Sequence, residues 1–318
     1  MERTPWGKRL LRARFWIYAL VVIVLLVFRV VPSLRSVPGA RKAPFGEKEL
    51  RISGLDNAPL LIPRLVAFYH QQYSDLRMET MPGGTIRAVE DLLNGRADVA
   101  FVSRPLTAPE DSVVRSVGDS LLLFPVALSG TLVLTARSTN LDELSVGGLR
   151  KVLLGQRPAE WPGTESAPVY APSPSSGFWG AVASQLGLAD TVGANVEWTE
   201  SDREAARMAE SHPGSIALIS SLAFDPSTEP GLRPVQVAAD PGTAAATPTP
   251  DAIAGGTYPL YHYLYASCRN RPRALAAGFV SFLHGEKGQM LVRREGFLPA
   301  REIAREIELG QMPAGMPR

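Results

Sequence analysis

The stretch Met81–Thr107, MPGGTIRAVEDLLNGRADVAFVSRPLT, contains the pattern that indicates the fold. It reads as a loop, a helix, a turn, a strand and a second loop. Gly83 and Gly84 leave the backbone free to take unusual dihedral angles. Thr85 is expected to cap the helix, and Gly95 suits the position just past the helix end. We therefore predict one loop–helix–strand unit of an α/β protein.

Apolar periodicity supports this assignment. The residues Ile86, Val89, Leu92 and Leu93 fall on one helical face, which we expect to be buried. The run Val99–Val102 is short and wholly apolar, as in a strand covered on both faces.

A hydroxyl and a cation follow that strand, as Ser103 and Arg104. Helix N-termini bind anions, and the carboxyl ends of strands in open α/β sheets border ligand crevices. Many α/β proteins have such a unit for packing alone, so this stretch predicts a ligand site without establishing one.

The pattern GG-T-x-x-x-V-x-x-L-L-x-G-x-A-D-V-A-x-x-SRPL resembles the phosphate-binding proteins of ABC transporters. In that family a Gly-Gly-Ser loop opens a helix, and SRPL follows a strand. The resemblance covers most of residues 50–300, and it includes GQRPAEWP at 155–162, PGSIALI at 213–219, YPL at 258–260 and GFLP at 296–299. The C-terminal pattern is specific among type II periplasmic binding proteins.

The resemblance implies an α/β, two-lobe type II periplasmic-binding-protein fold with two crossing strands. Lobe one is expected to comprise residues 49–125 and 262–318, and lobe two residues 126–261. A chain of 318 residues, of which 45% are hydrophobic, is large enough for two such units.

The N-terminus is read as a membrane anchor. Residues 1–14 are basic, and residues 15–31 are an apolar run close to the lower limit of about 17 residues for a spanning helix. The alternative is a cleaved signal peptide, but the best cleavage site has Pro38 at its −3 position. We therefore expect an uncleaved transmembrane helix, a linker at 32–48, and a globular part outside the cytoplasmic membrane.

Composition excludes several function classes. The net charge is +2, and the basic excess lies before the globular part, which argues against nucleic acid as a partner. A single cysteine and four histidines far apart give no metal-ligand spacing, so we expect no metal and no cofactor. No hydrolase or nucleotide-binding motif is present. A hydrolase that uses the serines at 175–176 with a distant histidine is kept as the one enzyme alternative.

Two further loops are candidate ligand loops. In the loop 54–59, Asp56 and Asn57 stand where the family has a ligand pair. Asp56 is also a plausible helix cap, and in a pocket it would repel a dianion. In 169–183, VYAPSPSSGFWGAVA, Ser176 and Gly177 match the family motif Arg-x-x-x-Ser-Gly-Thr, and Ser175 adds a hydroxyl.

The second loop lacks the family's strongest anion contact. Pro172 replaces the arginine and Phe178 replaces the threonine, so a bidentate oxyanion contact is lost. A Ser-rich turn with capping hydroxyls is therefore an equally good reading. Arg104, and less so Arg87, is the candidate replacement cation; the alternative is that both lie at the surface or that Arg104 pairs with an acid such as Asp98.

The expected function is capture of phosphate or a related small oxyanion and its delivery to ABC permease subunits. The alternative is a membrane-tethered sensor or scaffold that has lost tight phosphate binding. The expected ligand-binding residues are Asp56, Asn57, Gly84, Thr85, Ser103, Arg104, Ser175, Ser176 and Gly177.

Overall fold

The computed structural model describes residues 49–301, with gaps at 162–167, 175, 189–191 and 226–228. The predicted anchor at 15–31, the linker at 32–48 and Ser175 lie outside the described residues. Within the described ranges, no helix is both long enough and apolar enough to cross a membrane.

The described strands form one long sheet, with a separate parallel pair. The order along the sheet is β2-β1-β3-β11-β4-β8-β6-β7, and β9 and β12 also pair with β4. A second, two-stranded sheet joins β5 and β10. The strands are β1 (Glu49–Ser53), β2 (Arg77–Met81), β3 (Val99–Val102), β4 (Leu121–Ala136), β5 (Glu143–Ser145), β6 (Val169–Pro172), β7 (Val196–Thr199), β8 (Ile216–Ser220), β9 (Leu232–Pro234), β10 (Gln236–Ala238), β11 (Tyr261–Arg269) and β12 (Leu298–Pro299).

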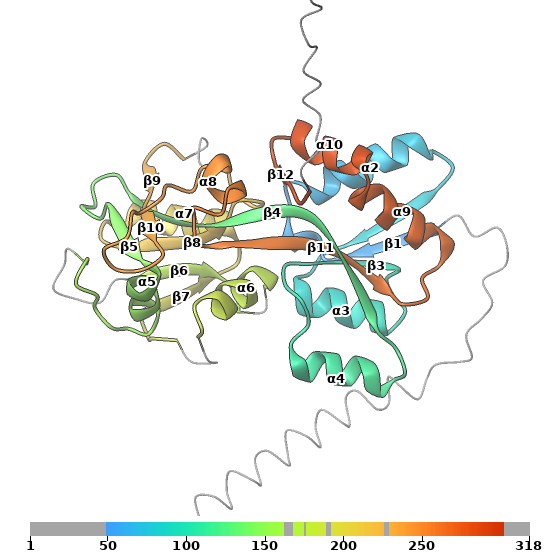
Figure 1. Cartoon of the computed structure of the whole chain (residues 1–318), viewed down its shortest axis with the longest axis horizontal. Helices are drawn as coiled ribbons and strands as arrows, with labels where there is room; N and C mark the ends of the chain where they lie inside the picture. The colour runs from blue at the N-terminus through green and yellow to red at the C-terminus, as the bar shows by residue number, and fades with distance from the viewer. Residues whose placement is uncertain (1–48, 162–167, 175, 189–191, 226–228, 302–318) are drawn as a thin grey trace, which may run out of the picture. The chain divides into compact units, whose positions relative to one another are not determined.

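Two strands cross between two lobes, which confirms the α/β two-lobe part of the predicted fold; the predicted transmembrane helix lies outside the described residues. The first part of β4 pairs with β11 in lobe one, and its last residues pair with β8 and β9 in lobe two. Figure 1 shows β4 and β11 running side by side from one lobe into the other. At about 3.3 Å per residue, the 16 residues of β4 are long enough to serve both sheets.

Helices cover both faces of each lobe. In lobe one, α2, α9 and α10 lie on one side of the sheet, and α3 and α4 lie on the other (Figure 1). The helices of this lobe are α2 (Ile62–Gln72), α3 (Thr85–Leu93), α4 (Ala108–Ser116), α9 (Ala274–His284) and α10 (Glu286–Arg294). Those of lobe two are α5 (Val146–Leu153), α6 (Gly177–Gln185), α7 (Asp202–Ser211) and α8 (Pro250–Ala254).

Alternation along β3 shows how the sequence builds these layers. Phe101 packs with the cluster under α2 and α9, whereas Ala100 and Val102 pack with α3. A strand covered on both faces is therefore confirmed, and burial of a larger apolar side chain such as Phe101 or Val102 supplies about 1.5–3 kcal/mol. The two large cores meet in β4, where Ala127 belongs to the lobe-one cluster and Leu128 to the lobe-two cluster.

Three local predictions were wrong. Gly84, not Thr85, is the N-cap of α3, and Thr85 is its first residue. Ile86 is 44% exposed, because the buried face of α3 is formed instead by Ala88, Val89 and Leu92. The sequence also predicts a helix over 141–154, but the helix begins only at Val146, because residues 143–145 pair with β10 as a strand.

Candidate functional site

Asn57 is the central residue of the polar network between the lobes. It follows Gly54, whose φ of +95° and close approach to the Phe101 carbonyl leave no room for a side chain. The Asn57 amide Nδ2 donates hydrogen bonds to the Gly54 and Phe101 carbonyls, at 3.1 and 2.8 Å. This pair of bonds ties the short 3-10 helix η1 (Leu55–Asn57) to the end of β3.

Two hydroxyls converge on the other atom of this amide. Thr85 Oγ1 and Ser103 Oγ each donate to Asn57 Oδ1 at 3.0 Å. The Ser103 N–H donates to Thr85 Oγ1, also at 3.0 Å. Asn57, Thr85 and Ser103 are between 1% and 4% exposed, so this network is buried and its hydrogen bonds satisfy one another.

Lobe two contacts the same network through the start of α6. Ser176 is the N-cap of this helix, and its hydroxyl oxygen accepts the Trp179 N–H at 3.2 Å. A Cβ added at Gly177 would lie 1.8 Å from Thr85 Oγ1 and 2.3 Å from Asn57 Oδ1. Only glycine fits this contact, and it brings the positive end of a helix dipole to the network.

The candidate cation Arg104 is engaged by an acid of its own lobe. Its two Nη atoms bond the two Glu110 carboxylate oxygens, at 2.7 and 2.9 Å. Burial raises the pKa of Glu110, but hydrogen bonds from Arg104 and Thr107 outweigh it and leave that pKa below its usual value. Arg104 also lies against Gly180 of α6, whose added Cβ would be 2.6 Å from Arg104 Nε. The alternative reading, an acid partner for Arg104, therefore holds with Glu110, whereas Asp98, the example it named, pairs with Arg51 and Arg273.

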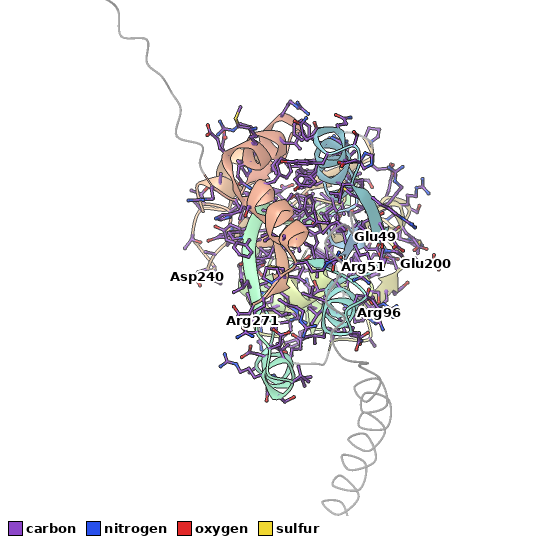
Figure 2. All side chains as sticks on the ribbon, turned by 90° about the vertical axis from the view of Figure 1, so that its right-hand side faces the viewer. Glu49, Arg51, Arg96, Glu200, Asp240 and Arg271 are labelled. Atoms are coloured by element: carbon purple, nitrogen blue, oxygen red, sulfur yellow. The ribbon has the colours of Figure 1, made fainter. Side chains whose placement is uncertain are left out.

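The buried carboxylate of Asp91 ties α3 to the end of β1, next to the Asn57 network. Asp91, on α3, is 2% exposed and accepts the hydroxyl of Ser53 at 2.7 Å. It also pairs with Arg96 at 2.7 Å and Arg87 at 3.2 Å, so the second candidate cation is engaged as well. Burial raises the pKa of Asp91, but the Ser53 and arginine contacts outweigh it, and the net shift is downward. Figure 2 shows Arg96 at the surface of lobe one.

Asp56 faces a loop, not the network. Its Oδ2 accepts the Gly83 N–H at 2.8 Å, and its side chain is exposed. Gly83 has a φ of +131°, so it is the residue of the Gly-Gly pair that requires glycine, whereas Gly84 has ordinary extended geometry. Of the predicted site residues, the structure brings together Asn57, Thr85, Ser103 and Gly177, and it engages Asp56 and Arg104 elsewhere. Gly84 and Ser176 are the N-caps of α3 and α6, and Ser175 lies outside the described residues.

Sequence reasoning missed a histidine beside this site. His262, on β11, has its ring centre 5.9 Å from that of Phe178, which follows Gly177. It is 7% exposed, and its Nδ1 has no hydrogen-bond partner among the described residues. Burial lowers its pKa to about 4. The signal in the sequence was the alternation of Leu260, just before β11, with His262 and Leu264 within it, all three buried.

A separate cavity lies at the carboxyl ends of β5 and β10. Its volume is about 560 Å³, and none of the predicted site residues lines it; the lining includes Ser145, Gly148, Lys151, Glu160 and Thr243. Glu160 already occupies the start of α5 there, accepting the Ser145 hydroxyl at 2.8 Å. Over the described ranges, no group of three or more histidine, cysteine, aspartate or glutamate side chains is placed to hold a metal ion.

Gly177→Ala is expected to keep the lobes apart, because the new methyl would collide with the buried Thr85 and Asn57 side chains. Spin labels on the exposed positions Glu90→Cys and Glu197→Cys would then report a longer distance than in the unsubstituted chain. The control is Gly147→Ala, where an added Cβ meets nothing within 4 Å. Equal distances in all three proteins would contradict the contact at Gly177.

His262 predicts a pH dependence of stability. The unfolded chain binds a proton on this histidine near pH 6.5, whereas the folded chain does not until about pH 4. The His262 contribution to stability is therefore complete above pH 6.5 and falls as the pH drops toward 4, by on the order of 2 kcal/mol between pH 7.5 and 5.0. Burial raises the pKa of Asp202 to about 6, which adds stability as the pH falls and partly offsets this loss, so the histidine is isolated by comparing variants in urea unfolding. His262→Phe should remove the His262 contribution and the exposed His70→Gln should not; a pH dependence unchanged in His262→Phe would refute the assignment.

Comparisons with known proteins agree with this architecture. Residues 44–287 match a family model described as a PBP superfamily domain. A putative phosphate ABC transporter substrate-binding protein from Clostridium perfringens, solved with bound phosphate, is similar with a TM-score of 0.65 and 18% identity, covering 80% of this chain and 100% of that one.

Two further solved structures are similar. An ABC-type phosphate transport receptor from Vibrio cholerae gives a TM-score of 0.65 and 22% identity, with 79% and 99% of the chains covered. PstS from Borrelia burgdorferi gives a TM-score of 0.53 and 21% identity, covering 80% of this chain and 99% of that one. Comparison with curated proteins gave no match. Because the family model spans more than half of the sequence, this chain belongs to the PBP superfamily.

Proposed function

We propose that this chain is an extracytoplasmic solute-binding protein that captures phosphate or a related small oxyanion between its lobes and delivers it to an ABC permease. One observation carries the proposal: hydroxyls from α3 and β3 and the N-terminus of α6 meet at one buried point. Hydroxyls and helix N-termini are donors that bind oxyanions. The similar proteins from Clostridium perfringens and Vibrio cholerae are a putative phosphate ABC transporter substrate-binding protein and an ABC-type phosphate transport receptor, which supports the ligand class.

The charges near this point favour hydrogen bonding over ion pairing. Arg104 is neutralised by Glu110, and Arg87 by Asp91. Pro172, at the end of β6, offers no side-chain donor in place of the family's arginine. Because an unpaired buried charge is costly, we expect weaker binding than in a site with a bidentate arginine, and Arg104 stays only a candidate contact.

A second candidate function is a membrane-tethered sensor or scaffold that keeps the fold and has lost tight phosphate binding. The specific observation in its favour is that the two hydroxyls are already bonded to Asn57. In that case, the lobes would close without a ligand, and the closed form would serve a protein partner.

The binding proposal is tested by calorimetry of the full chain in detergent, titrated with phosphate and with sulfate. We expect saturable binding that Gly177→Ala weakens by about tenfold or more, because the lobe-two donors no longer reach the ligand. Gly147→Ala should bind as the unsubstituted chain does. If the unsubstituted chain binds neither anion, the capture proposal is contradicted and the sensor or scaffold is favoured.

The anchor is proposed from the apolar run at 15–31 and the poor cleavage site after it. N-terminal sequencing of the protein from the membrane fraction should return residues from the start of the chain. A soluble, mature protein that begins near Arg41 would show instead that the segment is a cleaved signal peptide.

A further inference from the structure

We propose that the Asn57 side chain is a built-in competitor for the ligand, and therefore the residue that sets the affinity of the site. Its carboxamide oxygen receives the hydrogen bonds of Thr85 and Ser103, and it lies against Gly177. These are three of the groups that the capture proposal assigns to the oxyanion. The inference rests on that proposal and adds that the chain supplies its own substitute for one ligand oxygen.

The orientation of the amide is fixed by its other atom. Nδ2 donates to the carbonyls of Gly54 and Phe101, which are acceptors only. A flipped amide would turn its oxygen toward these two carbonyl oxygens and its NH₂ toward the two hydroxyls. The oxygen therefore faces Thr85 and Ser103.

The two hydroxyls have no spare proton for a ligand. Each hydroxyl carries one hydrogen, and both hydrogens go to Asn57 Oδ1 because this oxygen is only an acceptor. The Ser103 N–H is also committed, since it donates to Thr85 Oγ1. An oxyanion gains a hydrogen bond from Thr85 or Ser103 only when Asn57 loses it.

The closed contact also leaves no space for an added oxygen atom. An added Cβ at Gly177 would come within 2.3 Å of Asn57 Oδ1, which places the backbone of α6 directly on the amide. A ligand must therefore displace the Asn57 side chain and take its place against Gly177. If the competent state is a minor fraction of the protein, the apparent Kd rises in proportion. The unsubstituted chain should thus respond only to a high concentration of its ligand.

Asn57→Ala removes the competing oxygen and frees both hydroxyls. In the full chain titrated with phosphate by calorimetry, we expect this variant to bind about tenfold more tightly or better than the unsubstituted protein. Asn270→Ala, the same change at an exposed position, is the matched control and should bind as the unsubstituted chain does. Because the loss of the Nδ2 bonds could impair folding, thermal melting is compared, and Asn57→Ser serves as a second variant that retains a polar group.

A second substitution shows where the gain arises. Adding Thr85→Val to Asn57→Ala should reverse most of the gain, because the double variant lacks the hydroxyl that removal of Asn57 frees. The tightening on Asn57→Ala should therefore be smaller in the Thr85→Val background than in the unsubstituted chain.

The outcomes separate the inference from the function on which it rests. Tighter binding to Asn57→Ala, reversed by Thr85→Val, supports the competitor role. Equal or weaker binding to folded Asn57→Ala and Asn57→Ser, in a protein that binds phosphate, overturns it and leaves the capture proposal standing. If Asn57→Ala binds phosphate and the unsubstituted chain does not, the competitor role is supported and the unsubstituted chain is better described as the sensor or scaffold. No binding to any variant overturns both.

Discussion

Satisfaction of buried hydrogen-bonding groups is the constraint on which the interlobe contact depends. Thr85 and Ser103 are about 1% exposed, and a buried donor without an acceptor costs about 1–3 kcal/mol. In a ligand-dependent site the ligand supplies that acceptor. Here Asn57 Oδ1 supplies it, and the Asn57 Nδ2 is satisfied in turn by two backbone carbonyls. One side chain thereby lets the lobes meet without a ligand and holds together the ends of β1, α3 and β3.

The electrostatics follow the same principle of internal satisfaction. Arg104 and Glu110 neutralise each other beside α6, and Asp91 is matched by Arg87 and Arg96 behind α3. These pairs fix the elements that carry the network but provide no uncompensated positive charge for an anion. Recognition of an anion at this site would therefore rely on hydrogen-bond geometry and on the partial positive charge of the α6 N-terminus. The continuous strand β4 and its partner β11 connect the lobes, so relative lobe motion would bend these two strands.

The fold was readable from the sequence because its signals are local and repeated. The apolar run 99–102, the glycine at 95 and the family-like segments at 213–219 and 296–299 each indicate an element that the structure contains. The errors arose where a tertiary contact outweighed local pattern. Residues 143–145 form a strand because β10 lies beside them, and Ile86 is exposed because Ala88 and Asp91 face the sheet.

The site was only partly readable for a different reason. Resemblance placed Asn57, Thr85, Ser103 and Gly177 at ligand positions, and the structure brings these four together. The sequence could not show that Asn57 bonds the two hydroxyls, because this depends on a side-chain orientation set by the carbonyls of Gly54 and Phe101. It also could not show that Glu110 engages Arg104, because that pair forms through the first turn of α4.

The most direct test of this account is a crystal structure of the protein grown with saturating phosphate. The account predicts phosphate between the lobes, with oxygens accepting from Thr85, Ser103 and the backbone at Gly177, and the Asn57 carboxamide turned away from both hydroxyls. Closed lobes with Asn57 still bonded to Thr85 and Ser103, and phosphate absent from between the lobes, would contradict it.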